Sequence, residues 1–178
     1  ATTKKDFTNT NAITNWKLGA FSFFSWHPSC VSFFEQRLVF SATSVQPQTM
    51  FFSKSVDYEN MEGGTDDDDA MVYTIASNQV NAIQAMKATR TLIVMTTGGE
   101  YSVSSGNASA ITPTNISIVK QSNYGSASVD ALSIGNATIF LQRAKRKIRE
   151  LAYNFDTDGY VAPDLTILSN HITETGVV

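Results

Sequence analysis

The sequence predicts an all-β fold, and within that class an incomplete β-propeller of about three four-stranded antiparallel blades. Serine, threonine and asparagine are abundant, and β-branched and aromatic residues come in short runs, which favours strands separated by turns. A unit made of a short apolar strand, a tight connection, a stronger apolar strand, a turn and an alternating strand occurs three times. Four strands recurring every 40 to 50 residues or so are typical of a propeller blade.

The first unit occupies residues 30–79. Its predicted strands are Cys30–Phe34, Arg37–Ser41, Thr49–Ser53 and Met71–Ala76. Glu35-Gln36 connects the first two strands, and Pro47 marks the turn into the third. The unit is longer than the others because Val56–Asp69 forms an inserted loop, which contains Gly63-Gly64 and four consecutive aspartates.

The second and third units occupy residues 80–127 and 128–178. The strands predicted for the second are Val80–Met86, Thr91–Met95, Tyr101–Ser104 and Ile116–Gln121. Those predicted for the third are Ser128–Ser133, Ala137–Leu141, Ile148–Tyr153 and Leu165–Leu168. Gly98-Gly99 is a strong hairpin signal, and Gly135-Asn136 marks a second turn. Leu38, Leu92 and Ile139 take the same place in the three units.

One segment of the third unit has two interpretations. Apolar side chains recur at helical spacing near Gln142–Tyr153, so an amphipathic helix is an alternative there. The repeat favours a hairpin instead, with Ala144–Lys147 as its turn. For the whole chain, a β-sandwich of unrelated hairpins is the alternative to the propeller. Three blades do not close a propeller, so we expect this chain to be part of a larger polypeptide.

Residues 1–29 form an N-terminal segment that precedes the first unit. It is rich in aromatic residues, namely Trp16, Phe21, Phe23, Phe24 and Trp26. Such residues can stack on sugars or bases. We expect them rather to pack against the first blade or a neighbouring subunit, because Phe21 and Phe23 alternate with Ser22 as in an ordinary strand.

Composition excludes several classes of protein. The net charge of the 178 residues is −3 and only 16% of them are charged, which disfavours a general nucleic-acid binder. The single cysteine, Cys30, excludes an intrachain disulfide framework and a thiolate zinc cluster. No stretch approaches the roughly 18 uninterrupted apolar residues of a membrane span, so no membrane insertion of this domain is expected. His27 and His171 lack the context of a triad or a metal site, and no catalytic motif is found.

Two charged clusters are the candidate sites. The acidic cluster is Asp66, Asp67, Asp68 and Asp69. Adjacent aspartates diverge rather than converge on a cation, so we expect a solvated loop that supplies negative charge to a channel wall. The basic cluster is Arg143, Lys145, Arg146, Lys147 and Arg149. On a strand its odd-numbered members share one face and meet DNA or an acidic neighbouring subunit, whereas an exposed hairpin tip is the simpler interpretation.

A third acidic segment, Asp156-Thr157-Asp158-Gly159, resembles the opening of a calcium loop. The acid expected at its end falls at Ile167, so a plain turn is favoured.

Several segments, in order and spacing, resemble the nozzle or tail-hub proteins of podoviruses, known as tail tubular protein B or DNA-stabilisation protein. The resembling segments are Cys30–Phe40, Gln46–Ser55, Asp57-Tyr58, Asp68–Ala70, Ala76–Asn81, Gly98–Tyr101, Ile111–Pro113, Ile148–Tyr153 and Asp158–Thr166. They cover nearly all of the chain after Trp16 and match the middle portion of such proteins. The family usually has glycines where Ala144 and Lys145 stand here.

The resemblance implies a virion structural protein of a short-tailed bacteriophage tail, assembled in the host cytoplasm. It implies a homo-oligomeric ring, six copies in the family, through which DNA passes transiently during genome ejection. Other implied partners are the adaptor or portal and the tail fibre proteins. No catalytic residue, cofactor or metal ligand is expected. The main alternative is a propeller that binds or cleaves glycans, and a protein-interaction propeller without a viral role is a third.

Overall fold

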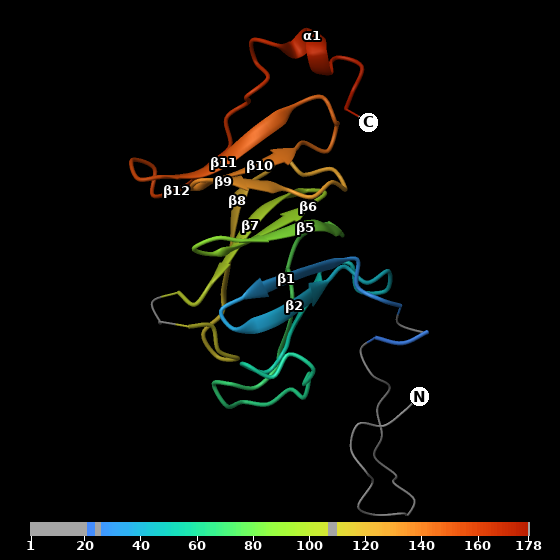
Figure 1. Ribbon diagram of the computed structural model, residues 1–178, viewed down its shortest axis with the longest axis vertical. Coiled ribbons are helices and arrows are strands. Elements are labelled where there is room, and N and C mark those ends of the chain that lie inside the picture. Colours follow the sequence, from blue (N-terminus) through green and yellow to red (C-terminus); the bar gives the residue numbers. More distant parts are fainter. Residues whose placement is uncertain (1–20, 24–25, 107–109, 178) are drawn as a thin grey trace, which may run out of the picture.

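A computed structural model describes residues 21–23, 26–106 and 110–177 (Figure 1). These residues form three four-stranded antiparallel sheets and almost no helix, which confirms the all-β prediction. Sheet 1 contains β1 (Cys30–Phe34), β2 (Arg37–Ser41), β3 (Thr49–Phe52) and β4 (Met71–Thr74). Sheet 2 contains β5 (Ile83–Ala88), β6 (Leu92–Thr96), β7 (Gly99–Ser104) and β8 (Ser117–Ser122). Sheet 3 contains β9 (Leu132–Ile134), β10 (Ala137–Leu141), β11 (Ile148–Asn154) and β12 (Gly159–Val161), followed by the short helix α1 (Asn170–Thr173).

The predicted hairpin between β10 and β11 is confirmed, and the helical alternative for Gln142–Tyr153 is wrong. Leu141 pairs with Ile148 at the closed end of the hairpin. In the turn, the Lys145 backbone N–H donates to the Gln142 carbonyl at 2.7 Å. Lys145 adopts a φ of 57° there. This left-handed conformation favours glycine. Lys145 adopts it all the same, so the turn forms without the glycine that the family usually has there.

The fourth strand of the third unit lies earlier than predicted. β12 is Gly159–Val161, whereas Leu165–Leu168 forms a turn before α1. The side-chain oxygen of Asn154 accepts a hydrogen bond from the Asp156 backbone N–H at 2.8 Å and tightens the turn after β11. The chain therefore returns at once, and the segment resembling a calcium loop is this plain turn. Two first strands also begin later than predicted, at Ile83 and at Leu132.

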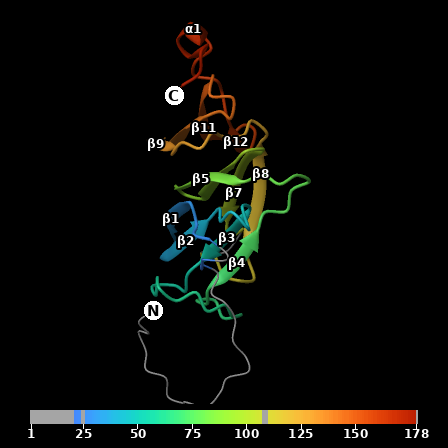
Figure 2. The same ribbon diagram turned by 90° about the vertical axis from the view of Figure 1, so that its right-hand side faces the viewer.

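The three sheets stack face to face along the long axis of the molecule (Figure 1). Each is a simple meander, with its strands in sequence order. The first strands β1, β5 and β9 lie along one side of the stack and the fourth strands β4, β8 and β12 along the other (Figure 2). Between sheets, β1 contacts β5 and β8 contacts β12. We call the side of β1, β5 and β9 the first-strand side.

Strand β6 is buried on both faces, which explains its continuous apolar run. Leu92 and Val94 pack toward sheet 1, and Ile93 packs toward Phe140 of sheet 3. The predicted equivalence of Leu38, Leu92 and Ile139 fails at the third position. Since Phe140 faces sheet 2, its neighbour Ile139 faces away from it, whereas Leu92 faces the preceding sheet.

The side of sheet 1 that faces away from sheet 2 is its outer face, and Phe21 covers part of it. The Phe21 ring lies edge-on to Phe40 at 5.3 Å and to Phe51 at 5.1 Å between ring centroids. The expected packing against the first sheet is therefore confirmed for Phe21. Phe23 and Trp26 are exposed, and Trp16 and Phe24 lie outside the described residues.

Candidate functional site

The acidic loop is held in place by a buried arginine at the start of β2. Arg37 is only 1% exposed. Its Nη1 donates to the carbonyl oxygens of Ser53 at 2.8 Å and Asp69 at 2.6 Å, and its Nη2 donates to that of Asp67 at 2.6 Å. Burial lowers the pKa of Arg37, but a guanidinium stays charged in proteins. The cation thus fixes the backbone of the loop, and its carbonyls replace water around the charge.

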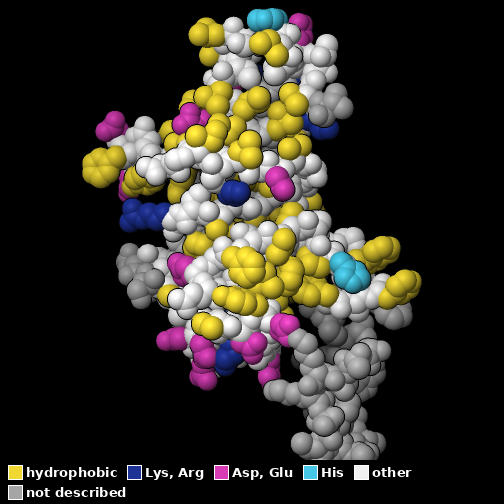
Figure 3. Space-filling model, in the orientation of Figure 1, with side chains coloured by type: hydrophobic (Ala, Val, Ile, Leu, Met, Phe, Trp, Pro, Cys, Tyr) yellow, Lys and Arg dark blue, Asp and Glu magenta, His cyan; other side chains and the backbone are white. Residues whose placement is uncertain are grey.

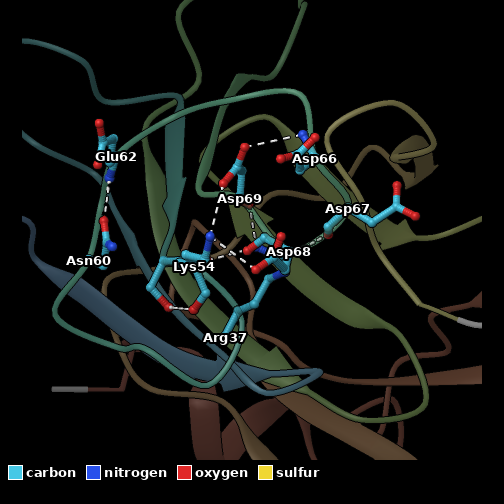
Figure 4. A network of polar contacts seen from close by, with 9 residues as sticks. Arg37, Lys54, Asn60, Glu62, Asp66, Asp67, Asp68 and Asp69 are labelled. Carbon is cyan, nitrogen blue, oxygen red and sulfur yellow. Dashed lines mark hydrogen bonds and ion pairs between the residues drawn. The ribbon is translucent and has the colours of Figure 1, made fainter.

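Lys54 neutralises half of the acidic cluster (Figure 4). Its ammonium lies 3.0 Å from Asp68 Oδ2 and 3.2 Å from Asp69 Oδ1. The hydrogen bond between the Lys54 and Asp68 side chains raises the pKa of Lys54 and lowers the pKa of Asp68. Asp66 and Asp67 are exposed, and the Asp67 carboxylate points away from Lys54. Among the described residues, no three His, Cys, Asp or Glu side chains are placed to hold a metal ion together.

The basic cluster is divided by the hairpin that contains it. Arg143, Lys145 and Arg146 are exposed around the turn, and we call these three residues the basic tip. Lys147 is paired with Asp164, at 2.8 Å between Nζ and Oδ2. The hydrogen bonds of Asp164 with Lys147 and Thr166 lower the pKa of Asp164 to about 2.

Arg149 points into the stack and is not available to DNA or to a neighbour. It is 8% exposed, and its Nη1 donates to the Ala162 carbonyl at 2.6 Å. Its guanidinium lies over the Tyr124 ring, 3.5 Å from the centroid. The expectation that the odd-numbered basic residues share one face therefore fails. Lys145 belongs to the turn, and the alternation along β11 directs Arg149 toward sheet 2.

Glu100 of β7 is a buried carboxyl that the sequence analysis missed. It is fully buried, and Ser122 of β8 donates a hydrogen bond to its Oε2. Its Oε1 has no hydrogen-bond partner in the described part of the chain. Burial raises the pKa of Glu100. A raised pKa is a mark of catalytic acids, but this carboxyl has no solvent exposure through which a substrate could reach it.

An open cleft of about 460 Å³ lies on the first-strand side of the stack. Its walls include Cys30 of β1, Gln84 of β5 and Asp130 in the segment before β9. The Cys30 thiol donates to the Gln84 carbonyl at 3.3 Å, and burial raises the pKa of the thiol, which disfavours a reactive thiolate. Asp130 is the one carboxylate among the described residues that line this cleft, whereas glycoside hydrolysis normally uses two.

A scan against models of known protein families finds no match, and a search of curated proteins also finds none. Within the described residues, no helix has the length and apolarity needed to cross a membrane.

Proposed function

We propose that the chain is a structural part of a short-tailed bacteriophage tail, namely three consecutive blades of a β-propeller in the nozzle or hub ring. This ring retains the genome in the virion and then conducts it during ejection. One observation supports the proposal most. Three meander sheets stack face to face with their first strands on one side, which is how the blades of a propeller are arranged (Figure 2).

The two end sheets support the incomplete propeller. Sheet 2 is covered on both faces, whereas sheets 1 and 3 each have one outer face that no other described sheet covers. Stacked repeats normally end in polar faces when they end in solvent. Here Val31 of β1 is 60% exposed and Leu132 of β9 is 63% exposed on the two outer faces. These exposed apolar side chains support further sheets at both ends of the stack.

The viral role itself rests on the sequence resemblance, and the chemistry of the described residues is compatible with it. A nozzle works by shape and by contacts between subunits, so it requires no reactive group. In this proposal the partners are other copies in a ring of six, the adaptor or portal, and the tail fibre proteins. DNA passes through the ring transiently. A single carboxylate in the first-strand cleft gives no support to a glycan-cleaving propeller.

The gene neighbourhood tests the viral role directly. Portal and adaptor genes beside the coding sequence would support it, and an operon of carbohydrate hydrolases would overturn it. A second test is immunogold labelling of purified virions of the phage that encodes this chain, with antibodies raised against the chain. Labelling confined to the tail is the expected result. Labelled capsids, or virions without any label, would contradict the proposal.

A further inference from the structure

The two junctions of the stack differ in what fills them. Among the described residues, the apolar cluster between sheets 1 and 2 includes large side chains such as Phe52 and Leu92. The cluster between sheets 2 and 3 is smaller, and three of its buried side chains are the alanines Ala85, Ala131 and Ala162. Hydrophobic stabilisation grows with the apolar area that is removed from water. The junction between sheets 2 and 3 therefore depends more on its polar contacts.

Backbone amides donate hydrogen bonds across the junction between sheets 2 and 3. Ser126, in the connection before β9, donates to the Thr96 carbonyl of β6 at 2.9 Å. Ser126 also forms a bridge with Gln142, just after β10, so it lies on the sheet 3 side of the junction. Tyr160 of β12 donates to Gln121 Oε1 of β8 at 3.2 Å. Both amides lose their acceptors when the two sheets separate, so their exchange with solvent reports on opening of the junction.

A buried carboxyl lies at the same junction. Acidic side chains gather at the sheet 1 end of the molecule, where they reach solvent (Figure 3). Glu100 of β7 differs from them, because it has no solvent exposure. Tyr101 and Val103 of the same strand pack toward sheet 1, so the alternation along β7 directs Glu100 toward sheet 3. An acidic group is thus held away from water where two sheets meet.

The Glu100 carboxyl is only partly hydrogen-bonded. Ser122 of β8 donates to its Oε2, and the Tyr124 backbone N–H also favours the ionised form. The Tyr124 ring does not face the carboxyl with its hydroxyl but packs under the Arg149 guanidinium. Oε1 has no partner in the described part of the chain. A buried carboxylate that lacks a donor on one oxygen is costly, whereas in water both oxygens would be solvated.

The cations on the neighbouring strands are engaged elsewhere. Arg149 of β11 attracts the carboxyl across the junction, but its guanidinium donates to the Ala162 carbonyl at 2.6 Å and to Gln142 Oε1 at 2.9 Å. Lys120 of β8 lies over the Tyr101 ring, on the sheet 1 side of sheet 2. Burial therefore outweighs the attraction of Arg149, and the pKa of the carboxyl is raised.

We propose that the junction between sheets 2 and 3 is a hinge that the proton of Glu100 controls. The junction stays closed while the carboxyl is protonated. Once the proton is lost, the carboxylate gains water only when sheet 3 moves away from β7, so ionisation favours the open form. Glu100 is the one buried acid among the described residues, so the junction between sheets 1 and 2 has no such control. This hinge is a property of the three sheets and does not depend on the viral role.

Amide hydrogen exchange of the full chain, resolved by NMR over a series of pH values, tests the hinge. The Ser126 and Tyr160 amides report on the junction between sheets 2 and 3. The Ile83 amide of β5 reports on the other junction, because it donates to the Pro47 carbonyl at 2.9 Å. After correction for intrinsic exchange, the opening constant at Ser126 and Tyr160 should rise by up to tenfold per pH unit above 4.5, the ordinary pKa of Glu100, until the raised pKa is passed. At Ile83 it should stay constant.

Two glutamine variants assign the effect to its group. Glu100→Gln cannot ionise, so the pH dependence at Ser126 and Tyr160 should disappear. Glu150→Gln, which changes a partly exposed carboxyl of β11, is the matched control and should behave like the parent. A parent whose opening constants do not vary with pH would overturn the inference, and this outcome needs no variant. So would an equal rise at Ile83, because the whole stack would then open, or a Glu100→Gln variant that keeps the parental pH dependence.

Discussion

Replacing Arg37 tests whether a buried cation orders the acidic loop. In Arg37→Met the hydrogen bonds to the Ser53, Asp67, Asp68 and Asp69 carbonyls disappear. Methionine keeps an apolar stem in the same space and removes the cost of burying a charge. We expect the inserted loop to open, while the three sheets keep their pairing, because Arg37 contacts the loop through its guanidinium.

The magnitude follows from what each carbonyl can do afterwards. Ser53 is fully buried, so its carbonyl loses a donor that water cannot replace, at a cost of about 1–3 kcal/mol. The three aspartate carbonyls belong to an exposed loop and regain water when it opens, which limits their share to about 1 kcal/mol in total. The free energy of unfolding should fall by about 3 kcal/mol. With a urea dependence of about 2 kcal/mol/M, the urea midpoint shifts by about 1.5 M.

Urea unfolding followed by circular dichroism measures this loss, and limited proteolysis locates it. Cleavage should appear within Val56–Asp69 in the variant and not in the parent. Lys54→Met is the matched control, since it removes ion pairs that lie in solvent and should change the midpoint far less. An Arg37→Met variant with the parental midpoint and parental proteolysis would refute the reasoning, because the loop would then be ordered without the cation.

Four further predictions concern the sheets and their junctions. Leu92→Ala should lower the free energy of unfolding by about 3–4 kcal/mol in urea titrations, since Leu92 is fully buried between sheets 1 and 2. Gly125 and Gly135 have φ of +72° and +59°, so alanine costs about 1–2 kcal/mol of backbone strain at either position. Only Gly125→Ala also drives its Cβ into the Thr97 carbonyl. Gly125→Ala should therefore lower the thermal midpoint at least twice as much as Gly135→Ala. The pKa of Glu100 is raised, so the folded protein holds the proton of this carboxyl more tightly than the unfolded chain does. The stability of the protein therefore falls as the pH rises above 4.5, the ordinary pKa, through the raised pKa. Glu100→Gln should stabilise the protein at pH 7 and flatten this pH dependence, and a variant less stable than the parent at pH 7 would contradict the argument. The pKa of Asp164 is lowered from 3.8 to about 2, so its stabilisation is complete above pH 3.8 and is lost as pH falls toward 2; Asp164→Asn should remove this acid-dependent part of the unfolding free energy.

The sequence by itself determined most of the strands and most of their hairpins, although it placed the fourth strand of the third unit too late. Leu92–Met95 is an unbroken apolar run, which suits a strand buried on both faces, and β6 is that strand. Gly98-Gly99 predicted the turn into β7 to within one residue: Thr97 and Gly98 form the turn, and Gly99 already pairs with Thr96. These features are local: strand period and turn chemistry act over a few residues, so they can be recognised without knowing what packs on them.

Tertiary structure alone decided what the charged residues do. Arg37 donates hydrogen bonds to carbonyls about thirty positions further along the chain. Arg149 stacks on Tyr124, which lies in the connection between β8 and β9. Glu100 is buried, and the groups near its carboxyl include Tyr124, in the connection before β9, and Arg149 of β11. The basic cluster is divided because side chains along β11 alternate between its two faces. A shift of one position along the strand would exchange the solvent-facing and core-facing residues. Such contacts depend on which distant strands come together. The periods of a strand (two residues) and of a helix (3.6 residues) indicate which face of an element is buried, but they do not say what packs on that face.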